Sequence, residues 1–536
     1  MKRLARILPL VVLVACFVGM TSQMALAQQS CESLKSIKLP NITITNAEAG
    51  ETGGPGSMAP KAGGLGGGAP KAGGSGGGAP KMGGPGSAKP QTPVPYCRVQ
   101  AYSTPTSDSH IGIEVWLPTE KNWNGKFLAA GNPGFIGSLS SAGLAGIMQR
   151  GYVAAGTDTG HVDGTAEWAI RHPEKWADWG YRAVHEMVVV AKRLSEAYYG
   201  RPVQYSYWNS CHNGGNQGLS EAQRYPDDFD GIVAADPAFH ISHIQPGTLY
   251  LSWVSLKDGT EAPGYIPTSK YAVLKNAALA ACDENDGLKD GIITDPPRCK
   301  FDPIVTLCKD GDKPDCLTAP QLETARKIYE GAKFKDGTRI YSGMAPGSEL
   351  QWTLVSEKAP FYVNVDFFKG MVFEDLNWDW LTFDVERDTR LGIERAGKYV
   401  DNNNPDLRPL KKAGGKLIIY HSWNSVALPT GSIVKYYEDV VKAVGGLKET
   451  QEFARLFVIP ESGGCVGTFN DETFNAFKAV QDWVEKGIVP ETITYVDRGE
   501  GGVSRTRPVC AYPKISRYKG SGDPNDGANF TCVDPK

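Results

Sequence analysis

Tyr207-Trp-Asn-Ser-Cys-His-Asn-Gly-Gly-Asn-Gln-Gly218 is the stretch of sequence that decides the fold. The β-type run 203–208 leads into it, and a helical pattern over 215–224 follows it. The two glycines allow a strand and a helix to approach each other closely. The stretch therefore predicts a tight strand-to-helix turn that holds His212 exposed at its tip.

Working outward from this turn, β-type runs alternate with helical patterns on both sides. Strands are expected at 111–117, 126–130, 152–157, 231–236, 416–420 and 456–460, and helices at 176–199, 432–443 and 472–486. Alternation of this kind is typical of a mostly parallel sheet with helices on both faces. The predicted class is α/β, with a doubly wound sheet.

Two segments depart from this alternation. Residues 241–409 are rich in Pro, Trp, Cys and acidic loops, and we interpret them as an inserted lid domain between 28–240 and 410–536. Residues 48–90 contain a ten-residue Gly/Pro/Lys repeat, which cannot bury a core and predicts a flexible loop.

The first residues have the layout of a cleavable secretory signal. Lys2, Arg3 and Arg6 precede an apolar run, and the small-residue site 25–27 follows, so residues 1–27 are excluded from the fold. Cys16 also resembles a lipoprotein cleavage site, which leaves a membrane-anchored form as the minor alternative. We expect a secreted or periplasmic protein with no transmembrane segment in the mature chain.

Charge and cysteine content agree with export. Loss of the leader lowers the net charge from -3 to about -6, and nothing in the sequence indicates nucleic-acid binding. Of the 11 cysteines, Cys16 leaves with the leader, and the even number that remains predicts disulfides in an oxidising compartment.

The motifs around the turn resemble those of the tannase and feruloyl esterase family. The resemblance rests on Gly180-Tyr-Arg-Ala-Val-His-Glu-Met187, on Glu221-Ala-Gln-Arg-Tyr-Pro-Asp-Asp-Phe-Asp-Gly231 and on Gly156-Thr-Asp-Thr-Gly-His161. It also includes Glu114-Val-Trp-Leu-Pro118, the segment after Cys282 and 417–437, so it covers most of the mature chain outside the Gly-rich loop. It implies an α/β-hydrolase fold with a lid, and a secreted serine esterase of phenolic esters with a Ser, Asp and His triad.

Each triad position implied by the resemblance carries a different residue here. His212 stands at the nucleophile, Ser425 at the aspartate and Gly464 at the general base. Acyl transfer by a triad needs a hydroxyl, an imidazole and an orienting carboxylate. The sequence therefore favours a degenerate protein that binds a small aromatic ester or phenolic ligand without turnover.

The alternative is an active aromatic ester hydrolase that uses His212 or relocated groups. Asp236, His240, His243 and His421 are considered, because their predicted loops could approach the cleft. His421 matches a histidine that the resemblance already implies at this place, so it is not a compensating gain. The aromatic-rich segment 352–380 is either a wall for an aromatic ligand or ordinary core.

An oxyanion site is expected at the backbone N–H of Asn213 and at the loop containing Gly131 and Asn132. The alternative for that loop is a simple turn.

Cys282-Asp-Glu-Asn-Asp-Gly-Leu-Lys-Asp-Gly-Ile292 concentrates carboxylates in a loop bent by glycines. Hard oxygen ligands at this density suit Ca²⁺. The resemblance implies a structural calcium ion in the lid, held by the side chains of Asp283, Asp286 and Asp290 and the carbonyls of Leu288 and Ile292.

The resemblance and proximity in sequence also imply the disulfide pairing. The expected pairs are Cys31 with Cys97, Cys211 with Cys465, Cys282 with Cys299, Cys308 with Cys316, and Cys510 with Cys532.

Overall fold

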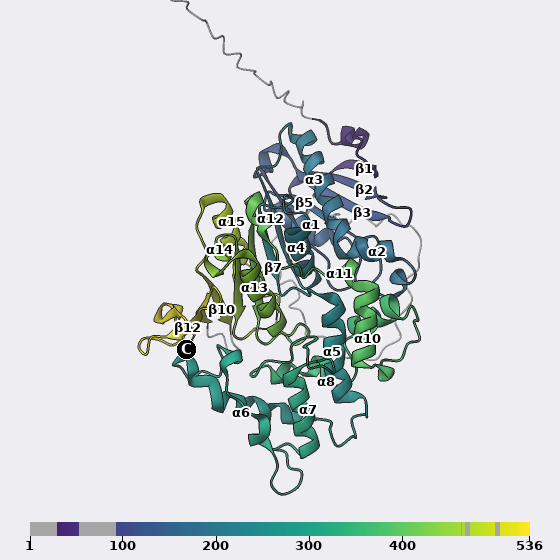
Figure 1. Ribbon diagram of the computed structural model, residues 1–536. Coiled ribbons are helices and arrows are strands. Elements are labelled where there is room, and N and C mark those ends of the chain that lie inside the picture. The colour runs from purple at the N-terminus through teal and green to yellow at the C-terminus, as the bar shows by residue number, and fades with distance from the viewer. Residues whose placement is uncertain (1–28, 53–92, 463, 467–471, 499–503, 536) are drawn as a thin grey trace, which may run out of the picture.

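The computed structural model describes residues 29–52, 93–462, 464–466, 472–498 and 504–535. The predicted signal at 1–27 and nearly all of the predicted Gly-rich loop at 48–90 lie outside these residues. Figure 1 shows a large central sheet with helices packed on its two faces and further helices grouped beyond one end of it.

Nine strands form the central sheet, in the order β1-β2-β3-β5-β4-β6-β7-β8-β9. The pairs from β1 to β5 are antiparallel, and those from β5 through β4 to β9 are parallel. The strands are β1 Ile42–Glu51, β2 Pro95–Ser103, β3 Ile111–Pro118, β4 Lys126–Ala129, β5 Val153–Thr157, β6 Tyr205–Cys211, β7 Gly231–Ala235, β8 Lys416–Ser422 and β9 Ala454–Ile459. The predicted mostly parallel α/β sheet is confirmed.

Helices cover both faces because side chains alternate across each strand. Along β6, Trp208 belongs to the core under α3, α4 and α13, while Tyr207 belongs to the core under α15. A smaller core lies under α1. These helices are α1 Ser141–Gln149, α3 Ala183–Tyr199, α4 Asn213–Arg224, α13 Gly431–Val444 and α15 Ala476–Lys486, with α14 Leu447–Gln451 between the last two.

The predicted helix 176–199 is divided in two. A π-helical turn at 178–182 separates α2 Pro173–Ala177 from α3. Gly180 lies in this turn, and a Cβ there would stand 2.1 Å from the carbonyl oxygen of Tyr399. The Tyr399 backbone therefore approaches the helix closely where its turn is widened. The helical periodicity of the sequence does not show this contact, so the break in the helix was not predicted.

Residues 241–409 enter between β7 and β8 and contribute no strand to the sheet within that fully described range. In Figure 1 their helices gather below the sheet and along one side of it. They are α5 Ile241–Leu256, α6 Tyr271–Cys282, α7 Ala319–Glu330, α8 Thr353–Ser356, α9 Tyr362–Phe367, α10 Val385–Gly392 and α11 Lys398–Val400, followed by α12 Arg408–Ala413.

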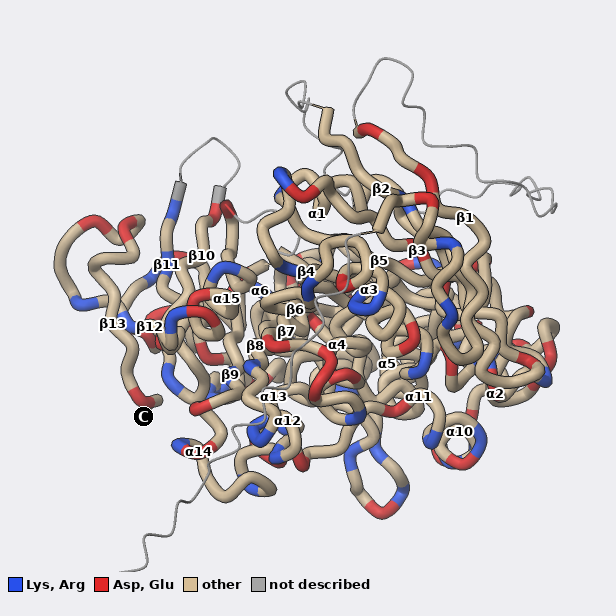
Figure 2. Tube along the Cα trace, turned by 90° about the horizontal axis from the view of Figure 1, so that it is seen from above, with Lys and Arg blue, Asp and Glu red and all other residues tan. Residues whose placement is uncertain are grey.

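Two small antiparallel sheets near the C-terminus were not predicted. They pair β10 Thr492–Arg498 with β11 Ser504–Cys510, and β12 Ile515–Tyr518 with β13 Phe530–Val533. Figure 2 shows acidic and basic residues interspersed over the described chain. Among the described residues, no helix is long and apolar enough to cross a membrane.

Candidate active site

The predicted turn between strand and helix is present, with His212 at its tip. β6 ends at Cys211, α4 begins at Asn213, and His212 between them adopts φ 55° and ψ -116°. A Cβ on Gly215 would lie 2.4 Å from the carbonyl oxygen of Ala235 on β7, so only glycine permits this helix to start so close to the sheet. The turn leaves the His212 side chain half exposed, at 48 %.

Asp236 lies at the centre of the site. It follows β7 directly, it is fully buried, and its φ of 40° falls in the region that favours glycine. Its Oδ2 lies 3.5 Å from Nε2 of His212 and accepts a hydrogen bond from Ser425 Oγ at 3.0 Å. Its Oδ1 lies 2.9 Å from Nδ1 of His421. Burial raises the pKa of Asp236, but the imidazoles of His421 and His212 outweigh it and hold that pKa well below its usual range.

Gly464 completes this group of residues. A Cβ at Gly464 would stand 2.4 Å from Asp236 Oδ2 and 3.7 Å from Ser425 Oγ. The structure therefore brings together all three positions at which the sequence was expected to differ from a triad, with the Asp236 carboxylate between them. That carboxylate occupies the space into which a side chain at 464 would project.

The disulfides follow the expected pairing. Cys211, next to His212, bonds to Cys465, next to Gly464, with their Cα atoms 5.6 Å apart. The other pairs are Cys31–Cys97, Cys282–Cys299, Cys308–Cys316 and Cys510–Cys532. The Cys211–Cys465 bond joins the two loops that carry the ends of the site.

A pocket of about 150 Å³ opens above His212. Its walls are largely apolar and come from the 133–135 loop, the π-helical turn at 178–182, the start of α4, the inserted segment including α5, and the chain between β8 and α13. They include Phe135, Trp179, Ile241, Ile244, Phe361, Tyr362, Val363 and Leu428. Phe361 and Tyr362 of the aromatic-rich segment line this pocket, whereas Trp352, Phe367 and Phe368 are buried core residues. The segment is thus ordinary core at Trp352, Phe367 and Phe368, and a wall for an aromatic ligand stays a prediction for Phe361 and Tyr362.

Asn364 is the polar side chain of this pocket with an unused acceptor. Its Nδ2 donates hydrogen bonds to Gln245 Oε1 at 2.7 Å and to Thr248 Oγ1 at 2.6 Å. The residue is only 3 % exposed, and its Oδ1 is buried without a hydrogen-bond partner. A buried acceptor without a partner is costly, and a donor on a ligand would satisfy this oxygen once the side chain turns it toward the pocket.

The expected oxyanion donors of the 131–132 loop are not available, and that prediction was wrong. The N–H of Gly131 donates to Ser210 Oγ at 3.0 Å, and the N–H of Asn132 donates to Gln217 Oε1 at 3.2 Å. Side chains of β6 and α4 hold this loop down, which the sequence pattern did not show. Asn213 is the first residue of α4, where the N–H has no acceptor within the helix.

The acidic loop also folds as a compact unit. Asp283 accepts from the N–H groups of Asp290 and Gly291, and Asp286 accepts from Leu288 N–H and Thr294 Oγ1. Burial raises the pKa of Asp286, and the negative charges of Asp290 and Asp283 add to this. Asp290 pairs with Arg507 through Oδ2 at 2.8 Å, while its Oδ1 is buried without a partner.

His240 and His243, which were candidates for relocated catalytic groups, lie elsewhere. They stand beside Asp401, and their rings lie in contact, with centroids 3.5 Å apart and planes tilted by 33°. Burial lowers the pKa of His240 to about 3 and that of His243 to about 4, and burial raises that of Asp401 to about 6. Of the relocated candidates, only Asp236 and His421 join His212. Asp401 was missed, because nothing in its polar run of sequence points to these histidines.

Comparison with known proteins agrees with this geometry. The profile of the "Tannase and feruloyl esterase" family matches residues 97–533. The chain belongs to the tannase and feruloyl esterase family. It is 35 % identical to an uncharacterized esterase of Xanthomonas campestris pv. campestris, over 82 % of this chain and 84 % of that protein. It is 32 % identical to a probable feruloyl esterase B-2 of Aspergillus terreus, over 82 % of this chain and 86 % of that protein.

Solved structures of this family share the fold. Feruloyl esterase B from Aspergillus oryzae superposes with a TM-score of 0.82 at 29 % identity, covering 94 % of this chain and 99 % of that one. Tannin acyl hydrolase from Aspergillus niger has a TM-score of 0.72 at 21 % identity, covering 94 % of each chain, and supports the fold alone. The α/β-hydrolase assignment is confirmed, and the family is one of carboxylic ester hydrolases that act on small esters.

Proposed function

We propose that this protein binds a phenolic or aromatic ester in the pocket above His212 and does not hydrolyse it through an acyl-enzyme. The observation that carries the proposal is the composition of that pocket. Its described lining residues include no serine, threonine or cysteine, and an imidazole occupies the tip of the turn. An acyl-enzyme of the serine type needs a hydroxyl at that point.

The surrounding residues support the loss of the triad. Ser425 has no carboxylate with which to orient a base, and Gly464 has no side chain to accept a proton. The pocket itself retains apolar and aromatic walls and the unpaired Asn364 Oδ1, which suits a ligand that combines an aromatic ring with a hydroxyl donor.

One contact favours a second candidate, a slow hydrolase. His212 Nε2 lies 3.5 Å from the buried Asp236 carboxylate, and an imidazole held by a carboxylate is a general base for water. Direct attack by such a water would release the acid without a covalent intermediate. Enzymes that lose triad members typically still accelerate the reaction by roughly 10³- to 10⁴-fold over water. We expect a rate enhancement of that size for this route.

Two measurements on the purified protein separate these functions. Calorimetric titration with ferulic acid and methyl ferulate measures binding, and hydrolysis of methyl ferulate, methyl gallate and a nitrophenyl ester measures turnover. Binding without turnover above the buffer rate supports the first function. The second function, slow hydrolysis, is supported if the wild type turns over an ester and both His212→Ala and Asp236→Asn abolish that turnover. The distant control His172→Ala should retain it. Absence of binding and of turnover would refute both.

We propose that the acidic loop binds a structural calcium ion. Asp283, Asp286 and Asp290 would supply carboxylates and Leu288 and Ile292 carbonyls, and the cation would neutralise the carboxylates that raise the pKa of Asp286. The buried, unpaired Oδ1 of Asp290 supports this assignment. When bound, the ion would fix the loop that Cys282–Cys299 closes.

We also propose that the protein is exported and works outside the cytoplasm, with 241–409 as a lid domain over the site. Five disulfides support an oxidising compartment. N-terminal sequencing of the mature protein would test cleavage after residue 27 against lipidation at Cys16.

A further inference from the structure

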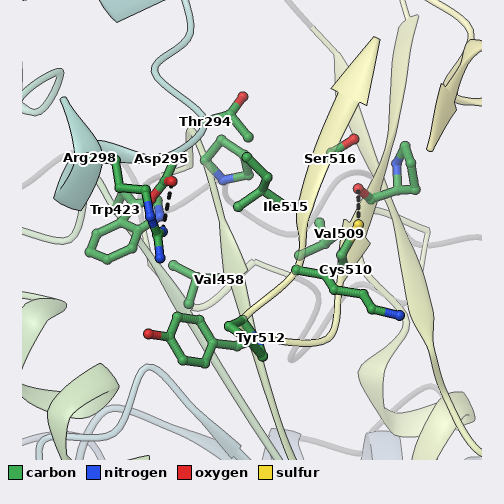
Figure 3. Close-up of a pocket in the computed structure, with 14 residues that line it drawn as sticks. Thr294, Asp295, Arg298, Trp423, Val458, Val509, Cys510, Tyr512, Ile515 and Ser516 are labelled. Carbon is green, nitrogen blue, oxygen red and sulfur yellow. Dashed lines mark hydrogen bonds and ion pairs between the residues drawn. The ribbon is translucent and has the colours of Figure 1, made fainter. Parts of the chain in front are cut away.

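The end of the chain between β7 and α5 and the first turn of α5 contribute side chains to two cavities. Ala238, Ile241 and Ile244 face the pocket above His212. Phe239, His240 and His243 face a larger cavity of about 890 Å³ on the other side. Part of the far wall of that cavity, with Arg298, Trp423 and Tyr512, appears in the close-up of Figure 3, where Arg298 pairs with Asp295.

Three potential metal ligands meet here, and two of them, His240 and His243, line the larger cavity. One ligand atom from each of His240, His243 and Asp401 lies within 4.8 Å of the others. Nε2 of His240 is 3.8 Å from Oδ2 of Asp401. Two imidazoles and one carboxylate are a common ligand set for zinc at sites that keep a position open.

The hydrogen bonds around these residues set which nitrogens are free. Ser242 Oγ donates to Asp401 Oδ2 at 2.6 Å and lies 3.0 Å from Nδ1 of His243. Because its one proton goes to Asp401, Ser242 accepts from Nδ1–H of His243, which leaves a lone pair on Nε2 of His243. The amide N–H of Asn403 donates to Nε2 of His240 at 3.1 Å, so this nitrogen carries a lone pair that a metal ion would take over from Asn403.

The backbone around Ser242 holds the carboxylate in place. Ser242 N–H donates to Asp401 Oδ1 at 2.9 Å, so Asp401 is fixed to the start of α5 by both oxygens. Hydrogen bonds of this kind to the ligands of a metal orient them and increase affinity.

We propose that His240, His243 and Asp401 form a binding site for a divalent transition metal ion, with Zn²⁺ as the best fit. Three protein ligands leave the fourth position of a tetrahedral ion open to water or to a ligand in the larger cavity. The site is distinct from the acidic loop, whose oxygen-only ligands favour calcium. It is also distinct from the residues around His212, where Cys211 and Cys465 are joined in a disulfide and cannot ligate.

Zinc titration of the untagged full-length protein, stripped with EDTA and exchanged into buffer, tests the proposal. Calorimetry at neutral pH should detect one zinc ion bound per chain, and Co²⁺ should give the visible absorption of a tetrahedral site. The double variant His240→Ala/His243→Ala should lose this binding, and Ser242→Ala should weaken it by about 10- to 100-fold. His212→Ala and His172→Ala, which remove histidines outside the site, should leave it unchanged.

Two results would overturn the assignment: no binding at micromolar zinc, or binding that the double variant retains. If the double variant does not fold, the wild-type protein supplies the decision. Bound zinc should protect His240 and His243, but not the exposed His172, from diethyl pyrocarbonate as mapped by mass spectrometry. Equal modification of all three with and without zinc would refute the site.

Discussion

Restoring the three expected triad residues should fail, because Asp236 occupies the space they need. The variant His212→Ser/Ser425→Asp/Gly464→His recreates a triad in sequence. In this structure it places an imidazole and a second carboxylate against a carboxylate that is already fully buried. We therefore expect a less stable protein without esterase activity.

The magnitude follows from two distances. The Cβ at 464 would lie 2.4 Å from Asp236 Oδ2, and overpacking of this kind costs about 1–3 kcal/mol. Ser425 Oγ is 3.0 Å from the same oxygen, so an aspartate there sets two like charges at short range. At about 4 Å and an effective dielectric constant of 20, that repulsion is about 4 kcal/mol. The two terms are comparable with the whole stability of many proteins, about 5–15 kcal/mol.

The remedy is a fourth substitution, Asp236→Gly. It removes the clash and the charge, and glycine suits the φ of 40° at this position. Differential scanning calorimetry should show the triple variant unfolding well below the wild type and the quadruple variant recovering. Only the quadruple variant should release nitrophenol from a nitrophenyl ester. Asp236→Gly alone is the control and should be inactive. A triple variant that is active and as stable as the wild type would refute the reasoning.

Three further predictions concern other parts of the molecule. Chelation of calcium should lower the unfolding temperature of the wild type, and Asp286→Asn should abolish that difference; an unchanged temperature with and without chelator would contradict the calcium assignment. Asn364→Leu should weaken binding of ferulic acid by about 1–3 kcal/mol while leaving its 4-O-methyl ether unaffected, because only the free phenol can donate to Oδ1; calorimetric titration that shows equal losses for both ligands would argue against this role. Burial raises the pKa of Asp178 to about 6, so the folded state holds this proton more tightly than the unfolded state and its stabilisation is lost as pH rises from about 4 to 6. Over that window the unfolding free energy of the wild type, from urea denaturation, should fall by about 3 kcal/mol relative to Asp178→Asn, and parallel profiles would disprove it.

The parts of the fold that local pattern determines were predictable. The turn at His212 and the strands on either side of it have apolar runs of the right length next to glycines, and the structure has them within a few residues. The antiparallel β1 was missed because only Ile44 and Ala47 of this strand are buried, while its threonines and glutamates are exposed, so it has no apolar run that stands out in the sequence. The C-terminal pairs were missed because their pairing depends on tertiary contacts more than on periodicity.

The site also contains residues that the sequence predicted and residues that it did not. His212, Ser425 and Gly464 were identified from motifs, and their proximity agrees with that identification. Asp236 was one candidate among several. Its importance comes from its short distances to His212, His421 and Ser425, and the spacing of residues in the sequence does not show such distances. Gly131 and Asn132 were misassigned as donors, because the acceptors that occupy their amides, Ser210 and Gln217, come from other elements.

The segment between β7 and α5 has a consequence for how the two cavities communicate. Its residues alternate between the pocket above His212 and the larger cavity, so neither wall can shift without moving the other. If a ligand bound on one side displaced these residues, the affinity on the opposite side would change as well, and thermodynamic linkage would make the two effects equal in size.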